Sequence, residues 1–133
     1  MGIFKVTNRH SDQGDIGVAH AIKWFASNGY AVCVPISEHQ DFDLVVVRGS
    51  EAAQKVQVKT TRHQTSFGIY EVSLVTRGGN QSWSGTSKYF DECYADIVFA
   101  VTDNGDYYLV PREAITSKAT LSLGKKMAAF QVW

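Results

Sequence analysis

Two segments, DFDLVVVRG (residues 41–49) and KVQVKTT (residues 55–61), decide the expected fold of this chain. Both are rich in valine and of strand length, and Gly49 with Ser50 between them is typical of a turn. In the second segment the valines alternate with Gln57 and Lys59, so the period of two places this polar pair on one face of a strand. We expect the valines to face the core and the polar pair to face solvent.

An amphipathic helix is expected before these strands, from about Asp12 to Asn28. Asp12 suits the N-cap, and Gly29 suits the position that ends a helix. At about 100° per residue, one apolar face gathers Val18, Ala19, Ile22, Phe25 and Ala26. Residues 30–36, YAVCVPI, predict a short strand after the helix.

The rest of the chain predicts further strands, a loop and a short helical piece. The expected strands are FGIYEVSLVT (67–76), ADIVFAV (95–101), YYLVP (107–111) and a closing strand near the end of residues 119–133. The Asn-Gly pair before YYLVP favours a hairpin with a type I′ turn, and a short helix is expected after Pro111. This order of elements predicts an α/β (α+β) fold in which helices flank a mixed central sheet.

The composition suits one domain that spans residues 1–133. Of the 133 residues 44% are apolar, and the 13 basic residues balance the 13 acidic ones, so any attraction to nucleic acid has to come from local clusters of charge. Cys33 and Cys93 lack the spacing of a zinc site, and we expect both to be reduced core residues. No long apolar run indicates a secretory signal or a membrane span, which predicts an intracellular, cytoplasmic protein.

A candidate reactive centre lies on the two strands of the opening motif. Metal-dependent cleavage of a phosphodiester bond needs a carboxylate for the metal, a second ligand and a cation near the phosphate. Asp43, Gln57 and Lys59 can supply these groups from neighbouring strands, and the Val58 backbone carbonyl is a further oxygen ligand. The same pattern also fits a half-buried sheet whose polar residues merely face water.

The motif resembles the PD-(D/E)XK endonuclease superfamily. FDLVV, a turn and QVKTT, preceded by a helix containing GDIG, resemble in particular the small homing endonucleases encoded by group I introns, in which Gln replaces the usual acid before x-Lys. YFDECYADIVFAVTDNGDYYLVP resembles the hairpin that follows the catalytic strands in those enzymes. The resemblance covers about residues 12–115.

The resemblance implies a hydrolase that cuts DNA with Mg²⁺, for which Mn²⁺ can substitute. Asp43 would then ligate the metal, Gln57 would orient a water ligand, and Lys59 would hold the nucleophile or the scissile phosphate. The family carries a Glu directly after GDIG, where this chain has Val18. Asp15 is a substitute ligand or simply an acid in the first helical turn. The alternative is a non-catalytic descendant that binds DNA or protein.

Two clusters without acids are candidate nucleic-acid contacts. The first is Lys55, Arg62 and His63 beside the centre, and the second is Arg77, Asn80, Gln81 and Lys88 in the loop 77–88. That loop fits an ordinary exposed hairpin loop equally well. Because cutting both strands of a duplex generally takes two centres, we expect a homodimer or a higher symmetric oligomer.

Overall fold

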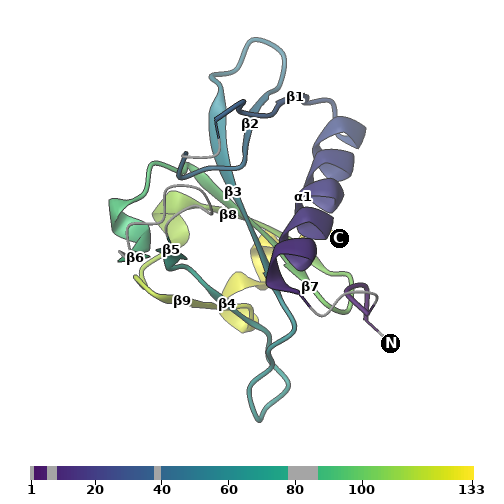
Figure 1. Ribbon diagram of the computed structural model, residues 1–133, viewed down its shortest axis with the longest axis vertical. Helices are drawn as coiled ribbons and strands as arrows, with labels where there is room; N and C mark the ends of the chain where they lie inside the picture. Colours follow the sequence, from purple (N-terminus) through teal and green to yellow (C-terminus); the bar gives the residue numbers. More distant parts are fainter. Residues whose placement is uncertain (1, 6–8, 38–39, 78–86) are drawn as a thin grey trace.

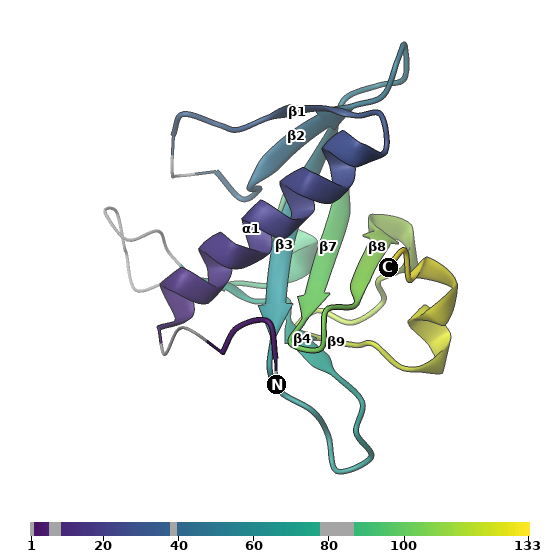
Figure 2. The same cartoon turned by 90° about the vertical axis from the view of Figure 1, so that its right-hand side faces the viewer.

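One α-helix, α1 (His10–Ser27), lies across one face of a five-stranded sheet (Figures 1 and 2). The computed structural model describes residues 2–5, 9–37, 40–77 and 87–133. The strand order is β1-β2-β3-β7-β8. The strands are β1 (Ala31–Cys33), β2 (Leu44–Val47), β3 (Gln54–Thr61), β7 (Ile97–Thr102) and β8 (Tyr107–Pro111).

The sheet is mixed, as the order of elements predicts. β1 is antiparallel to β2, and β2 is antiparallel to β3. β3 runs parallel to β7, and β7 is antiparallel to β8. A parallel pair requires a long connection between its strands. Residues 62–96 provide it and contain β4 (Glu71–Ser73), β5 (Thr76–Arg77), β6 (Ser87–Lys88) and the 3-10 turn η1 (Phe90–Glu92).

Two apolar clusters lie on opposite faces of the sheet. The cluster under α1 contains Phe4, Ala21, Phe25, Leu44, Val46, Val56, Ile97, Phe99, Val101 and Tyr107. The cluster on the other face contains Val72, Leu74, Phe90, Ala95, Val98, Ala100, Tyr108, Val110, Leu121 and Leu123. Because residues of β7 alternate between the two clusters, every residue of this central strand is buried.

The face opposite α1 is covered by strands and 3-10 turns. Strand β4 pairs with β9 (Thr120–Ser122), and β5 pairs with β6. The turns η2 (Arg112–Ala114) and η3 (Lys125–Phe130) complete this layer. Within the described part of the chain, α1 therefore packs on one face of the mixed sheet and the 3-10 turns lie on the other, in agreement with the predicted α/β (α+β) fold.

The boundaries of α1 differ from the prediction at its start and agree at its end. The helix begins at His10 with Arg9 at the N-cap, whereas Asp12 lies in the first turn and forms a 3.1 Å ion pair with Arg9. The predicted N-cap is therefore wrong. Gly29 follows the C-cap with a φ of 84°, a conformation that glycine adopts without strain and that ends the helix as predicted.

The buried stripe of α1 is rotated from the predicted one. Gly17, Ala21 and Phe25 are buried, while Ala19 and Ala26 are exposed. A Cβ at Gly17 would lie 2.2 Å from Thr60 Cγ2, so the missing side chain lets the helix approach β3 closely. A periodicity count of apolar residues overlooks glycine, which explains the error in the predicted face.

Several predicted strands are present but shorter. β1 covers Ala31–Cys33 of the predicted 30–36, and the predicted strand 67–76 is divided into β4 and β5. The tail has β9 near its start and the turn η3 near its end, where a strand was expected. A single bridge from Tyr108 to Gln131 holds the chain end against β8.

The hairpin of β7 and β8 is confirmed, but its turn is not type I′. Gly105 has a φ of 90°, and no residue other than glycine has a positive φ in the described chain, whereas type I′ needs positive φ at both central residues. The turn is closed by a 2.9 Å bond from Gly105 N–H to the Thr102 carbonyl. Since four residues separate β7 from β8, a longer loop replaces the two-residue turn.

The two cysteines lie in different environments. Cys93 is buried as predicted, but Cys33 is exposed on the edge strand β1, and both are free thiols. None of the described helices is both long and apolar enough to cross a membrane.

Candidate active site

The candidate centre lies where β2 and β3 separate. β2 pairs with β3 only from Gln54 to Val56, whereas β3 continues beside β7 as far as Thr61 (Figure 2). In the described chain no strand ladder covers β3 beyond Val56 on the side away from β7. This leaves an open edge of β3, which we define as residues 58–61.

Asp43 closes the fork between the two strands. Its backbone N–H donates to the Val56 carbonyl at 2.8 Å, and its Oδ2 accepts the Val58 N–H at 2.7 Å. The N–H and C=O of one strand residue point to the same edge of the strand. The Val58 carbonyl therefore points towards the same opening as the Asp43 carboxylate.

Gln57 and Lys59 lie on the face of β3 opposite α1. The register pairs Leu44 with Val56 under the helix, so Gln57 and Lys59 point to the other face. The prediction that this pair faces solvent is wrong, because Gln57 is only 4% exposed beneath the second layer. Gln57 Nε2 donates to the Asp41 carbonyl at 3.2 Å, and Lys59 Nζ donates to the Val75 carbonyl at 3.4 Å.

Burial shifts the pKa values of the two ionisable groups towards their neutral forms. Desolvation raises the pKa of Asp43, against the opposing effects of the Val58 N–H and the nearby Lys59 charge. Desolvation lowers the pKa of Lys59, against the opposing attraction of Asp43. Two half-buried groups of opposite charge with shifted pKa values therefore share one site, which is a common property of catalytic centres.

The oxygen donors at the fork suit a hard divalent cation that retains several water ligands. Asp43 supplies one carboxylate and Val58 supplies a backbone carbonyl at the same opening. Among the residues that the structure describes, no group of three His, Cys, Asp or Glu side chains is placed to hold a metal. Water would have to fill much of the coordination sphere, as it does in many Mg²⁺ sites.

The structure does not bring Asp15 to the fork. Asp15 is exposed, and it lies two residues from both Gln13 and Gly17, which contact Thr60 of β3. Two residues turn an α-helix by about 200°, so the Asp15 side chain points away from the sheet. Val18 is half-buried and packs against the apolar cluster under α1.

The predicted nucleic-acid contacts are dispersed. Lys55 Nζ lies 5.9 Å from the Phe42 ring centre and 5.7 Å from that of Tyr94. Lys88 is exposed and pairs with Asp41 at 3.2 Å, an interaction that raises the Lys88 pKa. Arg77 belongs to β5, and Asn80 and Gln81 lie outside the described residues.

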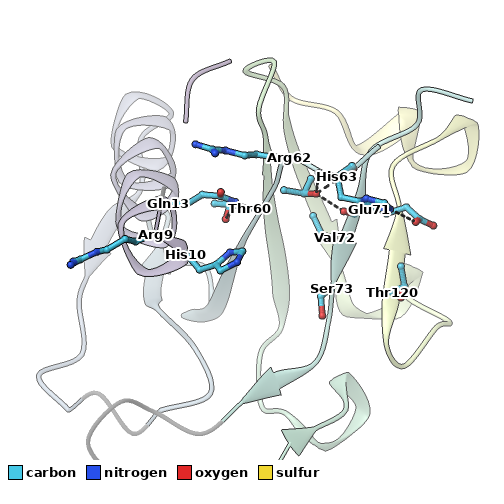
Figure 3. Close-up of a pocket in the computed structure, with 11 residues that line it drawn as sticks. Arg9, His10, Gln13, Thr60, Arg62, His63, Glu71, Val72, Ser73 and Thr120 are labelled. Atoms are coloured by element: carbon cyan, nitrogen blue, oxygen red, sulfur yellow. Dashed lines mark hydrogen bonds and ion pairs between the residues drawn. The ribbon is translucent and has the colours of Figure 1, made fainter. Parts of the chain in front are cut away.

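Arg62 and His63 line a pocket that the sequence did not predict (Figure 3). It has a volume of about 610 Å³ and lies between the start of α1 and β4. Its lining residues are Arg9, His10, Gln13, Thr60, Thr61, Arg62, His63, Glu71, Val72, Ser73 and Thr120. Four of these residues are basic and only Glu71 is acidic.

The first members of this lining come from the start of α1 and its N-cap, more than forty residues before β3 in the sequence. Gln13 Nε2 donates to Thr60 Oγ1 at 2.9 Å and fixes the start of the helix against the open edge. Gln13 and Gly17 are four residues apart and therefore share a helix face. This spacing is the one sequence signal that could have indicated the contact.

The mixed sheet, the helix on one face and the acid, amide and lysine at a strand fork constitute the PD-(D/E)XK nuclease fold. The chain belongs to the PD-(D/E)XK endonuclease family, whose model matches residues 8–129. Nucleases of this family generally use divalent metal ions.

The structure is also similar to that of a bacterial homing endonuclease, I-Ssp6803I. The TM-score is 0.69 at 20% sequence identity, over 94% of this chain and 88% of the other. None of the curated proteins searched matches this sequence. The family match confirms the superfamily that the sequence predicted, and the structural similarity shows that the chain shares its fold with a homing endonuclease.

Proposed function

We propose that this protein is a metal-dependent endonuclease that hydrolyses phosphodiester bonds of DNA. The observation that carries the proposal is the juxtaposition of Asp43 and Lys59, both half-buried and both with shifted pKa values, at the fork that opens onto the β3 edge. The similarity to I-Ssp6803I makes homing, or another form of sequence- or structure-specific cutting, the favoured kind of cleavage.

Each residue of the fork has a distinct part in this proposal. The Asp43 carboxylate and the Val58 carbonyl would hold Mg²⁺, or Mn²⁺ in its place, and the cation would supply positive charge at the phosphate and make a water more acidic. Gln57 orients a water ligand. Lys59 donates to the nucleophile or to a phosphate oxygen, and because burial lowers its pKa, its proton is more easily transferred than that of an exposed lysine.

The test is cleavage of mixed DNA substrates with Mg²⁺ and with Mn²⁺. We expect Asp43→Asn and Lys59→Met each to lower the cleavage rate by at least about 100-fold, the usual contribution of a single such group. Asp91→Asn and Lys126→Met are matched controls, because they make the same chemical changes at exposed positions. Circular dichroism checks that each variant is folded. Cutting at the parent rate by both fork variants would refute the proposal.

The proposed enzyme acts as a homodimer or a higher homo-oligomer, since two centres are needed to cut two strands. Light scattering of the protein with and without duplex DNA measures the assembly. If the protein remains a monomer when it is bound to uncut duplex DNA, the proposed activity would be limited to cutting one strand.

A second candidate function is DNA or protein binding without catalysis, and Val18 is the observation that favours it. Where related nucleases carry a Glu, this valine packs against the apolar cluster and supplies no carboxylate, and no group of three ligand side chains among the described residues is placed to hold a metal. This alternative is tested by titrating Mn²⁺ into the Val18→Glu variant and measuring the heat of binding. Val18→Gln is the control, because glutamine has the same size and carries no charge. Tighter Mn²⁺ binding by the Glu variant alone indicates a silenced nuclease site. Parent cleavage that depends on Asp43 excludes the non-catalytic alternative.

A further inference from the structure

The pocket beside Arg62 and His63 continues the candidate centre along one strand. Four consecutive residues at the end of β3 and just beyond it line the pocket: Thr60, Thr61, Arg62 and His63. Because successive side chains of a strand point to opposite faces, the lining includes side chains from both faces. A pocket lined from both faces lies at the strand's edge, and the open edge begins at Val58. Lys59 and Arg62 are three residues apart, or about 10 Å along an extended chain.

Three basic side chains line this pocket and come from two segments of the chain. Figure 3 shows His10 extending from α1 towards the sheet, while Arg62 and His63 come from the end of β3. The Arg62 guanidinium carbon lies 6.0 Å from the Phe4 ring centre, which directs the side chain back over the protein. Arg9 also lines the pocket, and its guanidinium is paired with Asp12.

Hydrogen bonds fix the walls of the pocket. Thr61 Oγ1 accepts the His63 N–H at 2.9 Å and donates to the Glu71 carbonyl at 2.5 Å. Gln13 and Thr60 hold the opposite wall. Glu71 is the one acid in the lining, and its carboxylate lies 3.5 Å from His63 Nε2. The remaining polar groups are hydroxyls and amides, which donate readily to phosphate oxygens.

We infer that the DNA backbone leaves the cleavage centre along the open edge of β3 and that one of its phosphates, a few nucleotides from the bond that is cut, binds in this pocket. The inference rests on the proposed function, since it takes the fork as the cleavage centre. A span of about 10 Å corresponds to about three base steps at 3.4 Å each, within one face of a duplex. The pocket therefore sets the direction in which the substrate crosses the protein.

The salt dependence of DNA binding tests the inference. Each phosphate contact contributes about 0.9 to the slope of log affinity against log salt on duplex DNA. Binding of a 20-base-pair duplex without divalent metal is followed by fluorescence anisotropy for the parent, Arg62→Gln and the matched control Lys126→Gln on η3. We expect the Arg62 variant to lose about one unit of slope and the Lys126 variant to lose nothing. Equal changes in both variants would overturn the inference, because they would reflect overall charge.

A second measurement separates a backbone site from a site for free phosphate. Backbone amide signals of residues 60–63 and 71–73 are followed by NMR during titration with a single-stranded hexanucleotide and with inorganic phosphate. We expect the hexanucleotide to shift these signals at concentrations where inorganic phosphate does not. Equal responses to both, or shifts confined to other parts of the chain, would refute binding of a DNA phosphate here.

The two proposals fail in different ways. If the parent cuts DNA but Arg62→Gln leaves the slope and the amide signals unchanged, the pocket inference is wrong and the nuclease proposal stands. If the parent does not cut but the slope and the signals respond as expected, the pocket binds nucleic acid and the nuclease proposal is wrong.

Discussion

At the scale of single residues, the candidate centre combines groups that a core normally excludes. Gln57 is 4% exposed, and desolvation is the largest cause of the pKa shifts of both Asp43 and Lys59. Burying charged groups costs free energy that their mutual attraction recovers only in part. The fork therefore has the character of a functional site whose polar groups lower the stability of the fold.

Asp43→Asn is expected to stabilise the protein at neutral pH. The pKa of Asp43 in the folded protein lies above the ordinary value of 3.8. As pH rises from that value, the folded protein therefore keeps the Asp43 proton longer than the unfolded chain does. The free energy of unfolding falls over this pH range. Asparagine keeps an oxygen for the Val58 N–H and carries no charge. We expect a gain on the order of 1 kcal/mol at pH 7 that disappears below about pH 4.

Urea unfolding of Asp43→Asn from pH 3 to pH 8 measures this gain, with Asp91→Asn as the exposed control. A variant less stable than the parent at pH 7 would show that the Asp43 charge stabilises the fold, and the assigned cause of the pKa shift would then be wrong.

At the scale of elements, the close contact of α1 with β3 depends on one glycine. Gly17 faces Thr60, whose Oγ1 accepts the Gln13 side-chain bond, and Thr60 also lines the basic pocket. The branched Thr60 side chain has few rotamers, so it cannot turn aside without losing that bond. The same contact thus sets the distance of the helix from the sheet and the shape of the pocket wall.

Gly14→Ala and Gly17→Ala are expected to have opposite effects. Both raise helix propensity equally, but a Cβ at Gly14 has no atom within 4 Å, whereas one at Gly17 lies 2.2 Å from Thr60 Cγ2. Gly14→Ala should gain about 0.5 to 1 kcal/mol, and Gly17→Ala should lose about 1 to 3 kcal/mol. Urea unfolding measures both, and equal gains would mean that the helix is not held closely against β3.

At the scale of the whole molecule, Arg112 binds the end of the crossover, the connection of residues 62–96 between β3 and β7, to the sheet. Its guanidinium donates to the carbonyls of Cys93 and Ala95 at 2.7 Å each and stacks over Phe90 with 4.9 Å to the ring centre. Further bonds reach the carbonyls of Phe90 and Asp91. One side chain that follows β8 therefore holds the segment that leads into β7.

Arg112→Lys is expected to destabilise the protein by about 2 to 3 kcal/mol, because a single ammonium cannot reach all of these carbonyls and buried acceptors are left unpaired. Hydrogen exchange should show faster exchange of the amides of residues 90–95. Arg48→Lys is the control, since Arg48 forms an exposed 3.4 Å pair with Glu51 and should change stability by less than about 0.5 kcal/mol. Unchanged protection in Arg112→Lys would show that apolar packing alone holds the crossover.

The sequence by itself predicted the candidate residues of the centre and determined the main elements that carry them. Asp43, Gln57 and Lys59 could be named because period-two alternation and one turn place them on adjacent strands. The helix end at Gly29 and the hairpin of β7 with β8 followed from glycine conformation and apolar patterning, which are local properties. These features depend on neighbours in the chain, so the sequence expresses them directly.

Only the tertiary structure decided what covers those residues and what lies beside them. Gln57 was expected in solvent, but the strands and 3-10 turns on the face opposite α1 form a second layer there, and no local pattern encodes that cover. The approach of α1 at Gly17, the pairing of Asp41 with Lys88 and the basic pocket all join segments more than forty residues apart. Contacts of this kind arise from packing between distant elements, so a pattern of nearby residues could not reveal them.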